Sequence, residues 1–339
     1  MLASSSRRAC LALGAALLAV PALAARARHR AFLFGSPVEL LLDNAAHRDE
    51  VIDGLAAMNR RWNAWKPGEV SRLNEALRAG RSARVSPALA ALLRGAAHLE
   101  VLSLGHFNAG IGGLVGAWGF HADRLEHGAA PPAPLVDSWA LARPSLQQLE
   151  WRGLEVASRN PALQLDFGAY AKGVALDWAL DRLHARGVRS ALLDLGGNLA
   201  AMGGADDGAR AWRIGLRDPF DAGGLLAVLE LQGREAVVTS GSYERWRIAD
   251  GQRVAHVIDP RSGRPAPEVV SVTVVHRDAG LADAAATALM VAGPERWRAL
   301  ALRMGVDQVL VVDRQGRRQA TPRLAARLVH PVTGERLMV

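Results

Sequence analysis

The segment from Leu163 to Asn198 constrains the fold of this chain more than any other. Its sequence, LQLDFGAYAKGVALDWALDRLHARGVRSALLDLGGN, predicts a strand, a tight turn, an amphipathic helix that stops at Gly187, and a buried strand. The turn from Asp166 to Lys172 exposes unpaired amides and the positive end of the helix dipole, which suit a phosphate. Lys172 would add a point charge there, or lie solvated on the first helical turn. The glycine spacing is neither that of a P-loop nor that of a dinucleotide-binding fold.

Short strands dominate the rest of the chain. We expect strands at 32–42 (interrupted at Gly35-Ser36), 212–216, 225–231, 236–239, 271–275 and 309–312, and a hairpin that turns at Asp250-Gly251. We expect helices at 48–62, 87–104, 281–292 and 294–304, a polar turn at 65–74, a glycine-rich loop at 106–120 and a surface excursion at 121–145. Because pairing between nearby strands dominates and helices are inserted, the pattern predicts an α+β fold and not a doubly wound α/β sheet.

The N-terminal residues have the layout of an export signal. Arg7-Arg8 precede an apolar run that ends in small residues at about Ala24. The run is short for a bilayer span, so we expect a cleaved signal at 1–24, a linker at 25–31 and one folded domain at 32–339. The protein is then expected to be periplasmic, exported by the Sec or the twin-arginine route. An uncleaved inner-membrane anchor is the alternative.

Composition limits the chemistry that the folded chain can carry. Half of the 339 residues are hydrophobic and 22% are charged, which excludes disordered and collagen-like chains. Cys10 is the only cysteine and lies in the N-terminal apolar run, so thiol nucleophiles and cysteine-ligated zinc are excluded from the folded body. The net charge of +8 comes from scattered arginines that seldom alternate with aromatic residues, so we expect no nucleic-acid partner. Lys66 and Lys172 are the only lysines.

Two residues on the expected helix at 281–292 could hold a divalent cation. Asp283 and Thr287 are four positions apart, which places a carboxylate and a hydroxyl on one helix face. Hard oxygen donors suit Mg²⁺, which completes its shell with water and phosphate. The alternative is that Asp283 caps or charges the first helical turn, and taken alone the spacing favours that alternative.

Three further segments carry groups suited to catalysis or ring binding. His256 begins HVIDPRSGRP directly after an expected strand, and its imidazole could accept a proton or serve as a hydrogen-bonded structural residue. Thr239 opens a second turn, and one hairpin joins the two turns, so we expect them to converge. Trp118 and Phe120 flank Gly119 and would either hold a flat ring or anchor their loop in the core.

In chain order these segments resemble the FAD:protein FMN transferase, or ApbE-like, family. The resemblance runs from about Phe32 to the end of the chain, and seven blocks in one order are hard to obtain by chance. The blocks are MNRRWNAWKPGEVSRLN (58–74), the glycine-rich segment ending in Trp118-Gly119-Phe120, DFGAYAKG (166–173), LGG (195–197), TSG (239–241), HVIDPRSGRP (256–265) and DAAAT (283–287).

The resemblance implies an ApbE-like (T-fold-like) fold with mixed, mainly antiparallel sheets, inserted helices and a central FAD cleft. It implies an exported, Mg²⁺-dependent enzyme that cuts FAD, moves FMN to a threonine hydroxyl of an acceptor flavoprotein and releases AMP. The usual acceptors of the family are membrane-bound subunits of respiratory complexes. The residues implied are Asp283, Thr287 and the Ala169 carbonyl for Mg²⁺; His256, as candidate base, and Asp283 for catalysis; and Met58, Trp118, Gly119, Phe120, Asp166, Lys172, Thr239 and Val257 for FAD.

The chain departs from the family pattern at two places, and two other functions remain open. Asn108 stands where such sequences often carry Asp, and Asn63-Ala64-Trp65 replaces a Ser-Thr-Tyr-like stretch, which bears on ring stacking at the cleft mouth. The alternatives are a Mg²⁺-dependent FAD pyrophosphatase, in which water replaces the threonine, and a non-catalytic exported flavin-binding protein. Asp283→Ala is expected to abolish turnover and to leave the fold intact, because it removes a ligand charge and no core volume.

Overall fold

The computed structural model describes residues 27–205, 210–231, 233–266 and 268–330. The signal predicted for residues 1–24 lies outside these ranges. Among the described residues, no helix is both long enough and apolar enough to cross a membrane.

The folded part begins earlier than the sequence predicted. Strand β1 (Ala27–Leu33) pairs along its whole length with β2 (Ser36–Leu42), so the linker expected at 25–31 is wrong from Ala27 onward. Arg28 and Arg30 both donate to Glu39 across this hairpin. The arginines that indicated a linker therefore belong to an edge strand, where charged side chains are usual.

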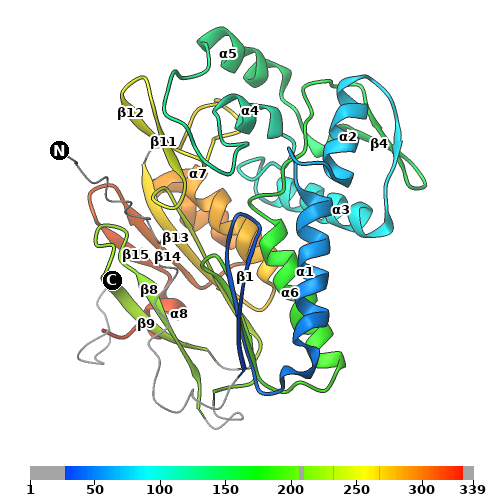
Figure 1. Cartoon of the computed structure of the whole chain (residues 1–339). Coiled ribbons are helices and arrows are strands. Elements are labelled where there is room, and N and C mark those ends of the chain that lie inside the picture. Colours follow the sequence, from blue (N-terminus) through cyan, green and yellow to red (C-terminus); the bar gives the residue numbers. More distant parts are fainter. Residues whose placement is uncertain (1–26, 206–209, 232, 267, 331–339) are drawn as a thin grey trace, which may run out of the picture.

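An eight-stranded antiparallel sheet forms the centre of the molecule (Figure 1). The strands β6 and β14 are buried along their entire length, as expected where both faces of a sheet are covered. The α+β class with mainly antiparallel sheets is confirmed. In spatial order the strands are β1, β2, β6 (Ala191–Leu195), β7 (Asn198–Met202), β10 (Glu235–Gly241), β13 (Val269–His276), β14 (Val309–Asp313) and β15 (Arg318–Ala320).

Different elements cover the two faces of this sheet. The helices α6 (Ala171–Ala185) and α7 (Ala279–Met304) share the larger core with one face. On the other face lie β8 (Trp212–Arg217), β9 (Leu225–Leu231) and α8 (Pro322–Ala325). Side chains alternate between the two cores along each strand, as at Leu40 and Leu41 of β2.

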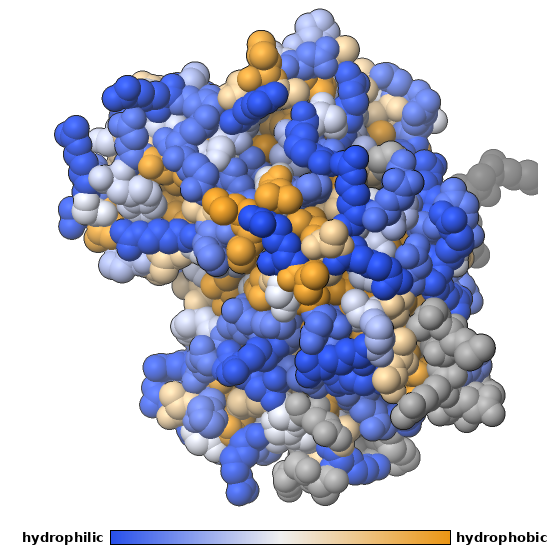
Figure 2. Space-filling model, turned by 180° about the vertical axis from the view of Figure 1, so that it is seen from behind, coloured by the Kyte–Doolittle hydropathy of each residue, from blue (hydrophilic) through white to orange (hydrophobic). Residues whose placement is uncertain are grey.

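The remaining elements surround the helical face (Figure 1). The molecular surface seen from behind is mostly hydrophilic, and hydrophobic side chains gather near the middle of this view (Figure 2). The remaining elements are α1 (Arg48–Trp62), α2 (Glu69–Arg78), α3 (Pro87–Leu102), α4 (Gly112–Ala117) and α5 (Ala133–Ala142), 3-10 turns at Ala45–His47 and Leu146–Gln148, the small sheet of β3 (Ala83–Arg84), β5 (Glu155–Ser158) and β4 (Leu149–Arg152), and the hairpin of β11 (Trp246–Ala249) and β12 (Gln252–Ala255).

Four local predictions are wrong. The strand expected at the start of the segment from Leu163 is only an isolated bridge between Gln164 and Ile111. The strand expected at 32–42 is the hairpin of β1 and β2, which turns through Phe34 and Gly35 at φ 53° and 70°. Part of the polar turn expected at 65–74 is helix α2, whose buried Val70, Leu73 and Leu77 follow a helical period. The glycine-rich segment contains the short helix α4. Gly112, the first residue of α4, must be glycine because a Cβ there would lie 2.8 Å from the backbone oxygens of both Gln164 and Leu165.

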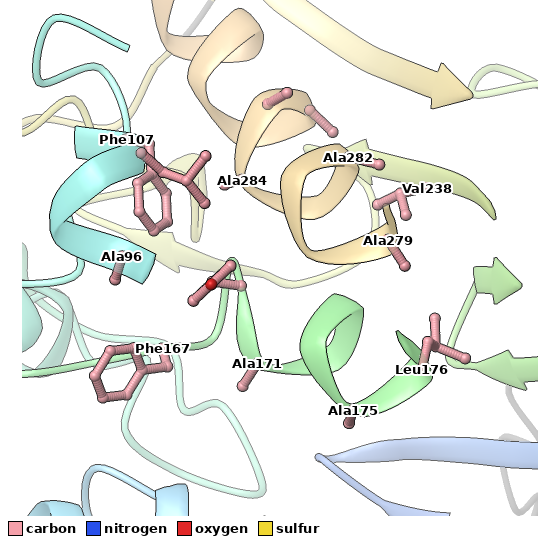
Figure 3. Packing of buried hydrophobic residues seen from close by; sticks show 14 of the residues in the cluster. Ala96, Phe107, Phe167, Ala171, Ala175, Leu176, Val238, Ala279, Ala282 and Ala284 are labelled. Atoms are coloured by element: carbon pink, nitrogen blue, oxygen red, sulfur yellow. The ribbon is translucent and has the colours of Figure 1, made fainter. Parts of the chain in front are cut away.

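Small side chains let α6 and α7 approach closely. Figure 3 shows α6 beside α7, with Ala279 on the turn of α7 that is nearest α6. A Cβ on Gly173 would lie only 2.2 Å from the Ala279 carbonyl oxygen. The N-terminal turns of the two helices are therefore adjacent. The helices expected at 281–292 and 294–304 are the two halves of α7, which breaks at Gly293.

Candidate functional site

The carboxylate of Asp283 joins α7 to the N-terminal turn of α6. Asp283 is 2% exposed; its Oδ2 accepts from the Gly173 N–H at 3.0 Å and its Oδ1 from the Asn198 side-chain amide at 2.9 Å. In the first turn of a helix such an N–H has no intrahelical partner. The side chain of Asp278 caps α7 by accepting from Leu281 N at 2.7 Å. The alternative that Asp283 caps its own helix is therefore wrong.

Oxygen donors suited to a hard cation lie near this junction. Burial raises the pKa of Asp283, and the charge of Lys172 and the two hydrogen bonds oppose that rise. A bound cation would favour the ionised form that burial disfavours. The Thr287 hydroxyl, one turn along α7, lies 3.2 Å from the hydroxyl of Ser240 on β10. Within the described ranges, no N–H donates to the Ala169 carbonyl.

The donor set fits Mg²⁺ better than a transition metal. The described residues contain no group of three or more His, Cys, Asp or Glu side chains placed to hold a metal. A metal at this junction would instead meet one carboxylate, one hydroxyl and one backbone carbonyl. Few protein oxygens, with water and phosphate completing the shell, are what Mg²⁺ accepts.

Lys172 places a positive charge among the candidate groups. It is half-buried, and none of the carboxylates that the structure describes forms a salt bridge with its ammonium group. Burial has the largest effect on three nearby pKa values: it raises those of Asp283 and Asp194 and lowers that of His256. The charge of Lys172 lowers all three. The three groups therefore lie within electrostatic range of one lysine. Burial raises the pKa of Asp194 to about 6.

The ring of His256 is held so that its Nε2 stays unprotonated. Its Nδ1 lies 3.1 Å from the Arg245 carbonyl oxygen, and because a carbonyl only accepts, Nδ1 carries the proton and Nε2 the lone pair. Burial lowers the pKa of His256 to about 4, so the ring is neutral at pH 7. The ring meets Phe120 edge-on at 6.3 Å. The structural hydrogen bond and a catalytic role are thus compatible.

The aromatic loop is anchored in the protein. Trp118 and Phe120 are buried in a small separate core, and the indole of Trp118 donates to the Gly263 carbonyl at 2.8 Å. Gly119 adopts φ 80°, and a Cβ there would lie 3.0 Å from the guanidinium of Arg247. Between the two expected roles for these rings, the burial favours anchoring.

Asp166 is ionised, and both of its carboxylate oxygens have hydrogen-bond partners. Its Oδ2 lies 2.8 Å from His121 Nε2 and its Oδ1 accepts from Gly168 N at 2.7 Å. Burial would raise the pKa of Asp166, but the hydrogen bonds and charge of His121, the Gly168 N–H and the charge of Arg245 outweigh it, so the pKa is lowered.

Three other expected residues lie apart from the Asp283 junction or serve packing. The hydroxyl of Thr239 pairs with that of Thr273 at 2.8 Å, and Thr239 shares a strand face with Val237, which packs in the core opposite α7. Because strand side chains alternate and the next residue, Ser240, faces α7, the Thr239 side chain lies on the opposite face of the sheet, and its role in the site stays a prediction. Met58 is half-buried on α1, and the buried Val257 closes its loop by accepting from Ala266 N.

The chain matches the ApbE family over residues 34–310. It belongs to this family. It is 46% identical over 271 residues to an FAD:protein FMN transferase of Rhodobacter capsulatus, covering 80% of this chain and 51% of that protein. It is 37% identical to one of Treponema pallidum, covering 67% of this chain and 66% of that protein. The match thus spans about half the length of the Rhodobacter relative.

Solved ApbE structures share the fold. The ApbE protein of Thermotoga maritima superposes with a TM-score of 0.81 at 25% identity, covering 90% of this chain and all of that one. The flavinyl transferase ApbE of Pseudomonas stutzeri superposes with a TM-score of 0.77 at 30% identity, covering 89% of this chain and 96% of that one. The ApbE-like fold expected from the motifs is confirmed.

The structure adds four residues that sequence reasoning missed in this ApbE chain. Ser240 and Asp194 sit inside or beside recognised blocks, TSG and LGG, and that adjacency was the available signal. His121 directly follows the aromatic block. Arg245 had no signal, because its role depends on carbonyls more than 120 positions earlier. The departure at Asn108 also has a reason: its amide donates to the Pro144 carbonyl at 2.7 Å, which a carboxylate could not do.

Proposed function

We propose that this chain transfers FMN from FAD to a threonine hydroxyl of an acceptor flavoprotein, with Mg²⁺, and releases AMP. The observation that carries the proposal is the junction of Asp283 with the N-terminal turn of α6 beside Lys172. A carboxylate, the other amides of this turn and a lysine that forms a salt bridge with none of the described carboxylates suit a diphosphate and its cation together. The names of the relatives in Rhodobacter and Treponema support the same activity.

We assign the metal to Asp283, Thr287 and the Ala169 carbonyl. Mg²⁺ held there would neutralise charge that builds up on the diphosphate oxygens of the substrate. The chain's own contribution is to orient that substrate: the amides of the α6 turn and the ammonium of Lys172 would bind its phosphate oxygens. Met58, the loop from Trp118 to Phe120, Asp166 and Val257 would shape the surrounding flavin-dinucleotide site.

His256 is the proposed base. Its free Nε2 would take the proton of the acceptor hydroxyl while the hydroxyl oxygen forms a bond to the FMN phosphorus. The bond from that phosphorus to the bridging oxygen breaks, and the oxygen leaves with AMP. The hydrogen bond from Nδ1 to the Arg245 carbonyl keeps the ring in the tautomer that this step needs.

The test is a measurement of AMP. Purified protein is incubated with FAD and Mg²⁺, with and without a co-expressed candidate acceptor, and the acceptor is weighed by mass spectrometry. The proposal predicts AMP only with acceptor, together with an acceptor mass raised by FMN. AMP without acceptor would instead indicate an FAD pyrophosphatase, and absence of AMP in both arms would indicate a flavin-binding protein.

We further propose that the protein works after export, on acceptor subunits that belong to membrane-bound respiratory complexes. The proposal is supported by the export-signal layout of residues 1–24, which lie outside the described ranges. Fractionation of cells that produce the full chain tests it. A cytoplasmic full-length chain would contradict it.

A further inference from the structure

Trp65, His121 and Asp166 form a column beside the proposed site. The ring of His121 stacks on Trp65 with centroids 4.9 Å apart and planes 19° apart, and its Nε2 lies 2.8 Å from Asp166 Oδ2. The side chains of His121 and Asp166 are 20% and 13% exposed. The column therefore links the loop after α1 to the turn that precedes α6.

The protein holds His121 in place from several sides. The guanidinium of Arg245 donates to the carbonyls of Phe120 and Ala122 at 3.1 and 2.9 Å, which fixes the backbone on both sides of the histidine. A Cβ on Gly116 would lie 2.9 Å from His121 Nδ1, so only glycine at that position leaves the ring its room.

The loop that carries Trp65 is tied to the same segment. The side chain of Asn63 accepts from Trp65 N and Lys66 N at 2.9 and 2.7 Å. Lys66 Nζ pairs with Asp123, two residues after the histidine, at 2.6 Å. The loop that carries Trp65 and the segment that carries His121 are therefore fixed to each other by an ion pair as well as by the stacked rings.

Asp166 creates an electrostatic difficulty that the column resolves. It places a negative charge two residues before Gly168, whose N–H it already occupies, on the turn whose remaining amides would bind phosphate. A carboxylate that is free to move there would compete with phosphate for those remaining N–H groups and repel it. The donor on His121 Nε2 engages the second oxygen at 2.8 Å and restrains the carboxylate.

We propose that His121 is a positioning residue for nucleotide binding: it restrains the Asp166 carboxylate so that the other amides of the turn before α6 remain open to the phosphates of the flavin dinucleotide. The proposal rests on the proposed function. It predicts that loss of the donor weakens binding of phosphate-bearing flavin and leaves the phosphate-free flavin almost unaffected. A role in stacking or folding alone would weaken both.

The test compares FAD with riboflavin on two matched variants, using quenching of flavin fluorescence by the whole chain. His121→Phe keeps a ring against Trp65 but removes the donor, and we expect Kd for FAD to rise about tenfold, the usual scale for a lost charge-assisted hydrogen bond, with Kd for riboflavin within about twofold. His121→Gln keeps a donor near the position of Nε2, and we expect FAD binding within about threefold of the wild type.

Further variants keep the result decisive. In an Asp166→Asn background no charge remains to be held, so adding His121→Phe should change FAD binding by less than about twofold. Unchanged FAD affinity in His121→Phe, equal losses for FAD and riboflavin, or no recovery in His121→Gln would overturn the proposal. If the wild-type chain binds no FAD at all, the proposed function fails instead, and the two failures are distinguishable.

Discussion

Removal of the Asp283 carboxylate should reduce both stability and activity. In Asp283→Ala the Gly173 N–H and the Asn198 amide lose their acceptor inside the protein. Each hydrogen bond to a charged group contributes about 1.5–3 kcal/mol. The variant also relieves the burial of a charge, which offsets part of that loss, so we expect the free energy of unfolding to fall by about 3 kcal/mol. The expectation from the sequence that this variant leaves the fold intact is revised accordingly.

Thr287→Val is the matched control because it removes a proposed Mg²⁺ ligand with little structural cost. Among the described residues its hydroxyl makes one hydrogen bond, to Ser240 at 3.2 Å, which contributes about 1 kcal/mol. Both variants should lose Mg²⁺-dependent formation of AMP. They should differ in stability by about 2 kcal/mol, the difference between the two estimates.

Urea unfolding and thermal scans, each with and without Mg²⁺, provide the measurement. We expect the thermal midpoint of Asp283→Ala to fall by about 5 °C and that of Thr287→Val by about 2 °C. We also expect Mg²⁺ to stabilise the wild type and neither variant. Wild-type unfolding of Asp283→Ala would refute the reasoning on hydrogen bonds. Normal Mg²⁺-dependent rates in Thr287→Val would refute the metal assignment.

Three further predictions concern the same junction. His256→Gln should bind FAD normally and lose about 10²–10⁴-fold in kcat. Folding lowers the pKa of His256 from 6.5 to about 4, so between these two pH values the unfolded state binds more protons than the folded state. The wild type should therefore lose up to about 3 kcal/mol of its free energy of unfolding as the pH drops from 6.5 to 4, and the variant should not. Gly173→Ala should destabilise the protein despite the helix propensity of Ala, because its Cβ would lie 2.2 Å from the Ala279 carbonyl oxygen. Lys172→Met should raise KM for FAD about tenfold with an unchanged thermal midpoint, since none of the described carboxylates pairs with it.

Each of these results can go the other way. A wild-type rate in His256→Gln would exclude it as the base, and an equal loss of stability at low pH in both proteins would place the titrating group elsewhere. A gain in stability for Gly173→Ala, measured by urea unfolding, would show that helix propensity outweighs the contact. An unchanged KM for Lys172→Met, measured in steady-state assays, would remove the lysine from the phosphate site.

Much of the fold follows from local patterns. The period of the apolar residues predicted α1 at its observed bounds and both halves of α7, and Gly293 with Pro294 marked the break between them. The residues of α2 were misjudged because the preceding Pro67-Gly68 and the polar composition indicated a turn, while burial of three side chains against distant elements stabilises a helix there. The hairpin of β1 and β2 was misjudged because arginines dominate its edge.

The sequence by itself determined the family, the α+β class and the residue types that a diphosphate and its cation need, because the motifs and their order are local properties of the chain. Only the tertiary structure decided which of these residues meet. Asp283 and Gly173 are 110 positions apart, and Asp166 and His121 are 45 apart. Such contacts depend on how α6 and α7 pack on the sheet, and on which face of β10 a side chain lies, so Ser240 and not Thr239 faces α7.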